Sequence, residues 1–316
     1  MAARRGDTLL FPTPPVVAAH AAIGGKKEGE SPLAAEFDEL SADNRFGQSS
    51  WEAAEKYLQL RAARLCLQKA ALPQEKVQLA LAGDLQAQCT ASSYAMRELG
   101  VPFAGLFGAC STMAEGLALG AALCEGGAAR NLLAMASSHF CAAERQFRTP
   151  LSYGAVRTPT AQWTATAAGA CLLRPAGEGV QLCAATFGRV QDYKIKDINN
   201  MGAAMAPAAA ATLLHYLKDT GSAPADFDRI YTGDLGHVGS QLLRDLLAAE
   251  GLLLKNHVDC GSLLYDAEGQ SVHSGASGPG CCAAVLCGHL LPRLERRGGS
   301  RALSSFSGLP HKHISL

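Results

Sequence analysis

The stretch from residue 103 to residue 127 carries the side chain with the clearest chemical potential, Cys110. A short apolar run predicts a buried strand, a Gly-Ala pair predicts a tight turn, and Cys110 stands at the tip of that turn. Ser111 and Thr112 then open a helix rich in alanine and glycine, which predicts close packing in the core. Because a helix N-terminus favours thiolate and anions, Cys110 is a candidate nucleophile or pocket residue. The alternative is a small buried side chain, since the chain has 11 cysteines.

The tripeptide Gly-Asp-Leu follows an apolar, strand-like run at residues 83–85 and again at residues 233–235, 150 residues later. Cys110 and Cys260 are also 150 residues apart, and the order helix, strand, Gly-Asp-Leu, helix, strand, cysteine recurs between them. An element order that is repeated at one unshifted offset indicates an internal duplication of an α/β unit.

Strands that alternate with helices are typical of mostly parallel sheets that are covered on both faces. Two such halves, predicted as residues 1–175 and 176–316, would share a buried layer of helices and form a five-layer α/β/α/β/α sandwich. The loops at the carboxyl ends of the strands would then meet between the halves, where ligands bind. These loops carry Asp84, Cys110, His139, Asp234 and Asp259.

The strand-end acids Asp84, Asp234 and Asp259 have two interpretations. Carboxylate oxygens are the ligands that Ca²⁺ prefers. A strand-end aspartate more often caps the helix that follows, and we favour that interpretation. The sequence has no Cys-x-x-Cys pair, so we expect no zinc site, and we predict neither a metal nor a cofactor.

The composition and charge of the chain limit the classes of protein to which it can belong. The chain has 28 basic and 28 acidic residues, so nothing suggests a nucleic-acid partner. Apolar residues make up 48% of the chain, which is typical of a globular protein with a large core. An odd number of cysteines and an N-terminus without a signal-peptide pattern predict reduced thiols in a cytosolic-type compartment. No apolar run reaches about 18 residues, so we expect no membrane span.

Several longer segments carry a resemblance to a known family. They are Ala-Gly-Asp-Leu at 82–85, Leu-Phe-Gly-Ala-Cys-Ser-Thr at 106–112, Ser-Ser-His at 137–139, Ala-Glu-Arg-Gln-Phe-Arg at 143–148, Met-Ala-Pro-Ala-Ala-Ala at 205–210, Thr-Gly-Asp-Leu at 232–235 and Asp-Cys-Gly at 259–261. Through these segments the chain resembles the stage V sporulation protein AD family of endospore-forming bacteria, whose thiolase-like fold is related to that of ketoacyl synthases. The resemblance covers about residues 10–300.

This resemblance implies a protein that binds dipicolinic acid (pyridine-2,6-dicarboxylic acid). It also implies a role in moving that acid, with calcium, into the developing spore beside membrane-embedded stage V sporulation proteins. The expected location is cytoplasmic, on the forespore side, and peripheral to the inner spore membrane.

The thiolase-fold condensing enzymes pair a cysteine nucleophile with His, and with His or Asn, from the second half. Cys110 matches the nucleophile, but the second-half loops carry Asp234 and Asp259, which would repel a developing oxyanion. His237 and His273 are candidate substitutes for the missing His and Asn. We therefore expect a non-catalytic ligand-binding protein. The alternatives are an acyltransferase or ketoacyl synthase that uses Cys110 and His237, and a structural partner in a membrane assembly.

A dicarboxylate requires fixed cations and N–H donors. Arg145, Arg148 and Arg157 lie close in sequence to His139, with Arg148 as the first choice and Arg145 as the second for contacting the ligand. The alternative is that these arginines lie on the surface or in a dimer interface. The ligand-binding residues that we predict are Cys110, His139, Arg145, Arg148, Asp234 and Asp259.

Two expectations concern assembly and the C-terminus. We predict a homodimer, because the fold pairs through a strand near the edge of the Cys110 sheet and two-fold pairing is common; the candidate strand is residues 132–136. The resemblance also implies a long apolar strand and a hairpin after position 300, whereas residues 301–316 are short and polar. We therefore expect the second half to be truncated, without its last strands.

Overall fold

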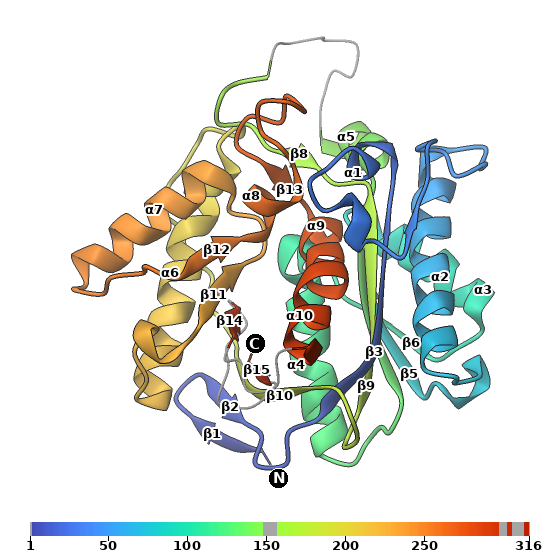
Figure 1. Ribbon diagram of the computed structural model, residues 1–316, viewed down its shortest axis with the longest axis horizontal. Coiled ribbons are helices and arrows are strands. Elements are labelled where there is room, and N and C mark those ends of the chain that lie inside the picture. The colour runs from blue at the N-terminus through green and yellow to red at the C-terminus, as the bar shows by residue number, and fades with distance from the viewer. Residues whose placement is uncertain (1, 148–156, 297–301, 305–312, 316) are drawn as a thin grey trace.

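The computed structural model describes residues 2–147, 157–296, 302–304 and 313–315. Figure 1 shows two β-sheets that enclose a layer of helices, and each sheet carries further helices on its outer face. This is the five-layer α/β/α/β/α arrangement that the sequence predicts.

The first half forms the core of the larger sheet. In spatial order its strands are β3 (Val16–Gly24), β9 (Ala167–Arg174), β7 (Leu132–Ser138), β5 (Leu79–Gly83) and β6 (Phe103–Gly105). β5 pairs in parallel with β6 and β7, whereas β9 runs antiparallel to β3 and β7. The prediction of a mostly parallel sheet therefore needs correction at β9 and also at β10 (Val180–Thr186), which runs antiparallel to β3. β9 runs back along β7, so the chain reverses its direction between these two strands, with α5 (Phe140–Phe147) and β8 (Trp163–Thr164) among the described elements of the connection.

The candidate dimer strand, residues 132–136, is a central strand. β7 pairs with β5 on one side and with β9 on the other, so its backbone N–H and C=O groups are already used. That choice of strand was wrong, because burial of an apolar run does not distinguish a central strand from an edge strand. The edge of the sheet at this end is β6, which pairs only with β5 among the described strands.

Two helices cover the outer face of this sheet, α2 (Trp51–Lys69) and α3 (Thr90–Leu99). The Ser50 side chain accepts a hydrogen bond from the Ala53 N–H, as the capping pattern in the sequence predicts. The buried face of α2 carries Leu58, Ala62 and Cys66 at helical spacing. The cap and the apolar stripe together fix where α2 begins and how it lies on the sheet.

The second half forms the smaller sheet, in the order β12 (His257–Asp259), β11 (Arg229–Thr232) and β14 (Ala302–Ser304), with all pairs parallel. Its outer face carries α6 (Met201–Thr220) and α7 (Gly236–Ala249). A further short strand, β15 (His313–Ser315), pairs with β10 (Val180–Thr186). Two strands after position 300 are thus present, each described over three residues.

The predicted boundary at residue 175 falls between β9 and β10. The strand β10 joins the larger sheet by pairing with β3, so hydrogen bonds cross this boundary. The division into residues 1–175 and 176–316 stays a prediction.

The central layer consists of α4 (Thr112–Glu125) and a continuous helical stretch from the second half. That stretch comprises α9 (Pro279–Ala284), the π-helical turn η6 (Val285–Leu290) and α10 (Leu291–Arg296). Glycines permit the close contacts that the sequence predicts: a Cβ at Gly120 would lie 2.5 Å from Leu173, and one at Gly169 would lie 2.4 Å from the Ala283 carbonyl oxygen. The two halves therefore share one core.

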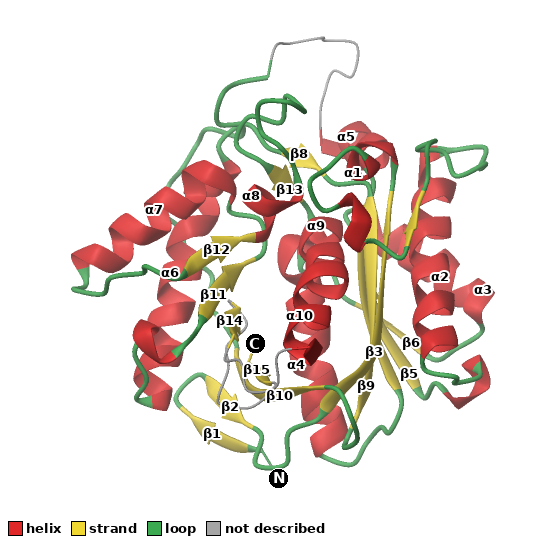
Figure 2. Cartoon of the chain, viewed as in Figure 1, coloured by secondary structure: helices red, strands yellow, loops and turns green. Residues whose placement is uncertain are grey.

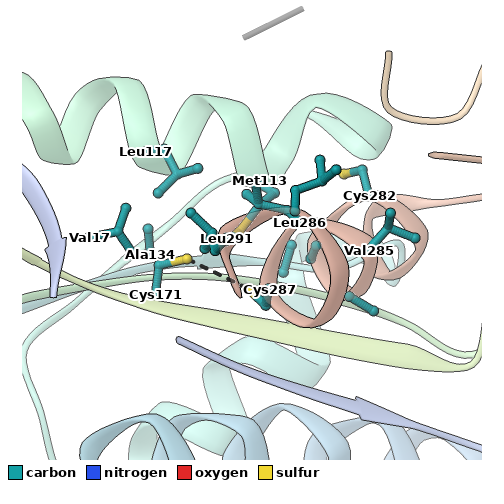
Figure 3. Close-up of a cluster of buried hydrophobic side chains, with 14 of the residues drawn as sticks. Val17, Met113, Leu117, Ala134, Cys171, Cys282, Val285, Leu286, Cys287 and Leu291 are labelled. Carbon is teal, nitrogen blue, oxygen red and sulfur yellow. Dashed lines mark hydrogen bonds between the residues drawn. The ribbon is translucent and has the colours of Figure 1, made fainter. Parts of the chain in front are cut away.

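Figure 3 shows this core where Met113 and Leu117 of α4 lie beside Leu286 of the second-half helix. The Sγ atoms of Cys171 and Cys287 are 3.5 Å apart, and both side chains are fully buried. All 11 cysteines are free thiols. Nine of them are buried, as predicted for core cysteines, and the cytosolic-type compartment stays a prediction.

The remaining elements are short. They are β1 (Ala3–Arg5), β2 (Thr8–Leu10), α1 (Lys26–Gly29), β4 (Glu39–Leu40), β8 (Trp163–Thr164), α8 (Cys260–Leu264), β13 (Ala276–Ser277) and the 3₁₀ turns η1 (Ala34–Glu36), η2 (Gln74–Lys76), η3 (Ala87–Cys89), η4 (Ala109–Ser111) and η5 (Pro224–Asp226). Among the described residues, no helix combines the length and the apolarity that crossing a bilayer requires.

Candidate functional site

Cys110 lies in the 3₁₀ turn η4, directly before α4, so the predicted strand, turn and helix are confirmed. Ala109 adopts a left-handed conformation with φ of 47°, which turns the chain sharply between β6 and α4. The Cys110 thiol lies beside the carboxylate of Asp234, to which the Gly278 N–H donates a hydrogen bond at 2.8 Å. Residues from both halves of the chain therefore meet at this thiol.

Asp234 ends the turn after β11 and is 4% exposed. Its carboxylate accepts a hydrogen bond from the Gly278 N–H at 2.8 Å, and the Ser277 hydroxyl and the Cys110 thiol lie beside it. Burial raises the pKa of Asp234 from 3.8 to about 6, although these three groups oppose the shift. Gly278 has a φ of 94°, and a side chain there would collide with Ser138, so glycine is required at this position.

The environment of Cys110 acts against thiolate formation. Burial raises the pKa of the Cys110 thiol well above its ordinary value, and the nearby Asp234 carboxylate raises it further. The sequence predicted the opposite effect from the helix N-terminus. A helix dipole amounts to about half a charge, which does not outweigh a buried carboxylate in direct contact.

Three more cysteines surround this pair. The Cys282 Sγ lies 3.5 Å from the Cys110 carbonyl oxygen. Cys260 and Cys281 lie close enough to Asp234 for its charge to raise the pKa of their thiols. Burial raises the pKa of each of these thiols well above the ordinary value. They are neutral, small side chains that line the site without adding charge.

Asp259, the second acid predicted at this site, has a different role. It accepts hydrogen bonds from the N–H groups of Leu235, Gly236 and Ser262 at 2.8–3.0 Å, and from the Thr232 hydroxyl at 2.6 Å. The carboxylate caps α8 and holds the turn that carries Asp234. The interpretation of a strand-end aspartate as a cap is confirmed here, and Asp259 supports the site from outside it.

Asp84 is also a cap. Its oxygens accept hydrogen bonds from the Gln86 N–H, the Ser92 N–H and the Ser92 hydroxyl at 2.6–2.8 Å, which ties the loop to the first turn of α3. Beside it lies Glu55, fully buried, which accepts from the Gln86 amide and the Ser137 hydroxyl. Burial first, and then the charge of Asp84, raise the pKa of Glu55 to about 8.

Of the two predicted arginines that the structure describes, Arg157 has the stronger link to the site. Its guanidinium donates to the Gln162 carbonyl oxygen at 2.9 Å and pairs with Glu144 at 3.1 Å. The Gln162 amide in turn donates to the Asp234 carbonyl oxygen at 2.8 Å. Arg157 is therefore connected to the backbone of Asp234 through one residue, with its side chain 14% exposed.

Aromatic rings pack against the same guanidinium. Phe140 and Trp163 are stacked with centroids 3.9 Å apart, and the Arg157 Cζ lies 5.1 Å from the Phe140 centroid and 4.7 Å from the Trp163 centroid. Lys27 lies over Trp163, with Nζ 4.6 Å from the ring centroid. Figure 2 shows that loops surround β8 and β13 at this end of the molecule. Two cations and two aromatic faces thus gather beside the Asp234 turn.

The other predicted residues lie apart. His139 is buried, bonds through Nε2 to the Asn44 carbonyl oxygen at 2.8 Å, and burial lowers its pKa, so it is a neutral packing residue against Trp51. Arg145 is exposed and pairs with Glu52 at 3.0 Å. His237 and His273 are exposed. Arg148, the first choice for the ligand, lies outside the described residues.

Sequence reasoning did not assign roles to Ser277, Gly278 and Gln162. The glycine-rich run at 274–280 was a signal for close backbone approach, but the distance along the chain from Asp234 to Gly278 hid the contact. Within the described ranges, no group of three or more His, Cys, Asp or Glu side chains is arranged to hold a metal ion.

Comparisons with known proteins agree with this fold. The family described as stage V sporulation protein AD matches residues 5–312. The stage V sporulation protein AD of Bacillus subtilis (strain 168) is 41% identical over 290 residues, which cover 92% of this chain and 86% of that protein.

Solved structures of thiolase-like synthases share the fold. Xanthomonas campestris OleA with bound lauric acid and lauroyl-CoA has a TM-score of 0.62 at 15% identity, covering 93% of this chain and 95% of that one. The 3-oxoacyl-(acyl carrier protein) synthase III of Pseudomonas aeruginosa has a TM-score of 0.57 at 18% identity, covering 92% of this chain and 93% of that one. The predicted thiolase-like fold is confirmed.

Proposed function

This chain belongs to the stage V sporulation protein AD family, and from that premise we propose that it serves spore formation by binding dipicolinic acid without catalysing acyl transfer. The observation that carries the proposal is the position of the buried Asp234 carboxylate beside the Cys110 thiol, whose pKa it raises. It places an acid where a condensing enzyme needs a group that stabilises thiolate and oxyanion.

Asp234 is a poor partner for catalysis by Cys110. A histidine base becomes a cation when it takes the thiol proton, and that cation stabilises the thiolate. A carboxylate becomes neutral, and its pKa of about 6 lies far below that of the buried thiol, so the proton stays on sulfur. An oxyanion formed beside ionised Asp234 would also meet a like charge.

The surroundings of Arg157 support binding of a planar aromatic dicarboxylate. A carboxylate buried without a cation costs several kcal/mol, and Arg157 is a partly buried cation that is linked to the Asp234 turn through Gln162. Phe140 and Trp163 offer aromatic surface beside it. Arg157 replaces Arg145 in our proposal for the basic wall, because Arg145 is exposed and paired with Glu52.

Isothermal titration calorimetry of the full chain with dipicolinate, with and without Ca²⁺, tests the proposal. We expect saturable binding, and we expect Arg157→Ala to weaken it by about 2–5 kcal/mol, as for loss of a desolvated charge partner. Arg145→Ala is the matched control and should bind like the wild type, and Arg148→Ala extends the series. Circular dichroism confirms that each variant is folded. Absence of binding at millimolar dipicolinate, with and without Ca²⁺, would overturn the proposal.

The alternative function is an acyltransferase or ketoacyl synthase with Cys110 as nucleophile, and the fold shared with OleA is the observation that favours it. Intact-mass spectrometry after incubation with an acyl-CoA distinguishes the two. We expect no acyl adduct on the wild type. A stable thioester that disappears in Cys110→Ala would favour the enzyme.

We further propose a homodimer that pairs through the β6 edge and works beside the inner spore membrane with membrane-embedded stage V sporulation proteins. Phe107, which follows β6, is 64% exposed and would be covered by such pairing. Light scattering at micromolar concentration tests the dimer, and Phe107→Glu should shift the mass toward the monomer. We propose no nucleic-acid partner, because the chain has 28 basic and 28 acidic residues and therefore no excess of positive charge.

A further inference from the structure

A cavity of about 460 Å³ lies at the end of the larger sheet that points away from Cys110. Its wall is formed by the C-terminal end of α4, by Arg130 before β7 and by residues 174–176 at the end of β9. Cys110 stands before the other end of α4, and a helix of 14 residues is about 20 Å long. The cavity is therefore separate from the site beside Cys110, and the proposed binding of dipicolinate does not use it.

The sheet brings two arginines to this cavity. β7 begins where its antiparallel neighbour β9 ends, so Arg130 and Arg174 lie at the same end of adjacent strands. The Arg174 Nε donates to the side-chain oxygen of Asn131 at 3.0 Å, which links the two strand ends. The N–H groups of Arg130 and Asn131 donate to the side-chain oxygen of Gln78 at 2.6 and 3.3 Å. Both arginines thus stand on backbone that hydrogen bonds hold in place.

Positive charge predominates in the wall of the cavity. Two guanidinium groups and one carboxylate line it, from Arg130, Arg174 and Glu125, although the chain as a whole has 28 basic and 28 acidic residues. The Glu125 carboxylate accepts a hydrogen bond from the Ala2 N–H at 2.7 Å, and Figure 1 shows this end of α4 close to the N-terminus of the chain. The carbonyl groups of residues 122–124 accept from the N–H groups of residues 126–129. The negative groups at the end of α4 are therefore engaged by the chain itself.

These side chains suit an oxyanion. A guanidinium presents a planar fork of N–H donors that matches two oxygens of a phosphate or carboxylate group. The bond to Asn131 uses the Nε of Arg174, so its two terminal nitrogens can donate to a ligand. Cys124, Pro175 and Ala176 add apolar wall, and the volume falls within the range of about 300–1,000 Å³ that small-molecule sites have.

We propose that this cavity binds a small molecule through a phosphate or carboxylate group held by Arg130 and Arg174. The site is independent of dipicolinate binding beside Cys110. Phosphate and carboxylate share the chemistry that the guanidinium groups recognise, and pyrophosphate and citrate are probes that distinguish them.

Isothermal titration calorimetry of the full chain with pyrophosphate, and separately with citrate, tests the site. Constant ionic strength is needed because added salt screens exposed charges. We expect saturable binding of at least one probe. Arg130→Gln and Arg174→Gln should each weaken it about tenfold or more, as for the loss of a charged hydrogen-bond donor.

Arg64→Gln is the matched control. Arg64 is an exposed arginine on α2, which covers the other face of the sheet, and it lies 3.6 Å from Glu98. The substitution removes the same charge from the chain and should leave the affinity unchanged. Circular dichroism shows whether each variant is folded.

Glu125→Gln should change the affinity in the opposite direction. It removes the negative charge from the wall and keeps an oxygen that can accept from the Ala2 N–H, so the probe should bind several-fold tighter. A gain in affinity separates this effect from damage to the fold.

Three results would overturn the proposal. They are absence of binding of both probes at millimolar concentration, equal affinity of the wild type and the Arg130→Gln/Arg174→Gln double variant, and equal weakening by Arg64→Gln. None of them bears on the binding of dipicolinate, which its own titration tests.

Discussion

The tripeptide Gly-Asp-Leu ends β5 in the first half and β11 in the second, so Asp84 and Asp234 start from equivalent positions. In the first half, Asp84 accepts hydrogen bonds from Gln86 and Ser92 and fixes its own loop to α3. In the second half, the N–H groups of the turn, Leu235 and Gly236, bond to Asp259 of the neighbouring strand. Asp234 is thereby free to face Cys110 and Gly278.

The difference shows how a repeated motif acquires a new role. Backbone N–H groups in a buried turn must have an acceptor, so Asp234 can leave its capping position only because Asp259 supplies the acceptors instead. The buried partner also differs: Asp84 lies beside the acid Glu55, and Asp234 contacts the thiol of Cys110. The first copy of the motif supports the fold, and the second supports a site.

The largest effect that we expect from breaking this arrangement comes from Asp259→Ala. The variant leaves three backbone N–H groups without an acceptor in a buried turn. At about 1–3 kcal/mol for each unsatisfied group, with partial relaxation, the free energy of unfolding should fall by about 3–5 kcal/mol. Urea denaturation at pH 7.5 measures it. A loss below about 1 kcal/mol would show that Asp259 does not replace the cap.

A second test concerns Glu55, the acid beside the first copy. Because burial raises its pKa from 4.5 to about 8, the folded state favours the protonated form, and stability is lost as pH rises from about 4.5 to about 8. Relative to Glu55→Gln, which has no proton to lose, the wild type should lose about 3–4 kcal/mol of unfolding free energy between pH 5 and pH 8. Parallel pH profiles of the two proteins would contradict the assignment of the proton to Glu55.

The two aspartates themselves should respond differently to the same substitution. Asp84→Asn places an amide N–H₂ against donors and should cost about 1–3 kcal/mol of unfolding free energy at pH 7.5. Burial raises the pKa of both carboxyl groups, but the Asp234 carboxylate accepts one backbone N–H, whereas the Asp84 carboxylate accepts two N–H groups and a hydroxyl. Asp234→Asn should therefore lower the unfolding free energy by less, about 1 kcal/mol or below. Thermal and urea denaturation of both variants measure the difference. Equal losses would mean that both copies are structural.

The smallest effect belongs to a residue outside both turns. Arg145 forms an exposed ion pair with Glu52, and such pairs contribute about 0–1 kcal/mol. Arg145→Ala should therefore change the unfolding free energy by less than about 0.5 kcal/mol. The same urea titrations provide the measurement, and a larger loss would show that the segment after His139 stabilises the fold through this arginine.

Part of this architecture could be predicted from the sequence, because the relevant contacts are local. The cap of α2 at Ser50, the turn before Cys110 and the glycines of α4 are read from residues within a few positions of each other, and the structure confirms each of them. The antiparallel direction of β9 and the central place of β7 were missed. Both depend on how strands are ordered in the sheet, which an apolar run does not encode.

The sequence by itself determined the duplicated α/β plan, the strand-end position of each aspartate and the turn that presents Cys110. Only the tertiary structure decided which aspartate caps a turn and which contacts the thiol, and that Arg157 rather than Arg145 lies near the site. The physical reason is distance along the chain. A cap is chosen among neighbours three or four residues away, whereas Asp234 meets Gly278 across 44 residues and Cys282 meets Cys110 across 172. Those partners exist only after both halves have closed on the shared layer of helices.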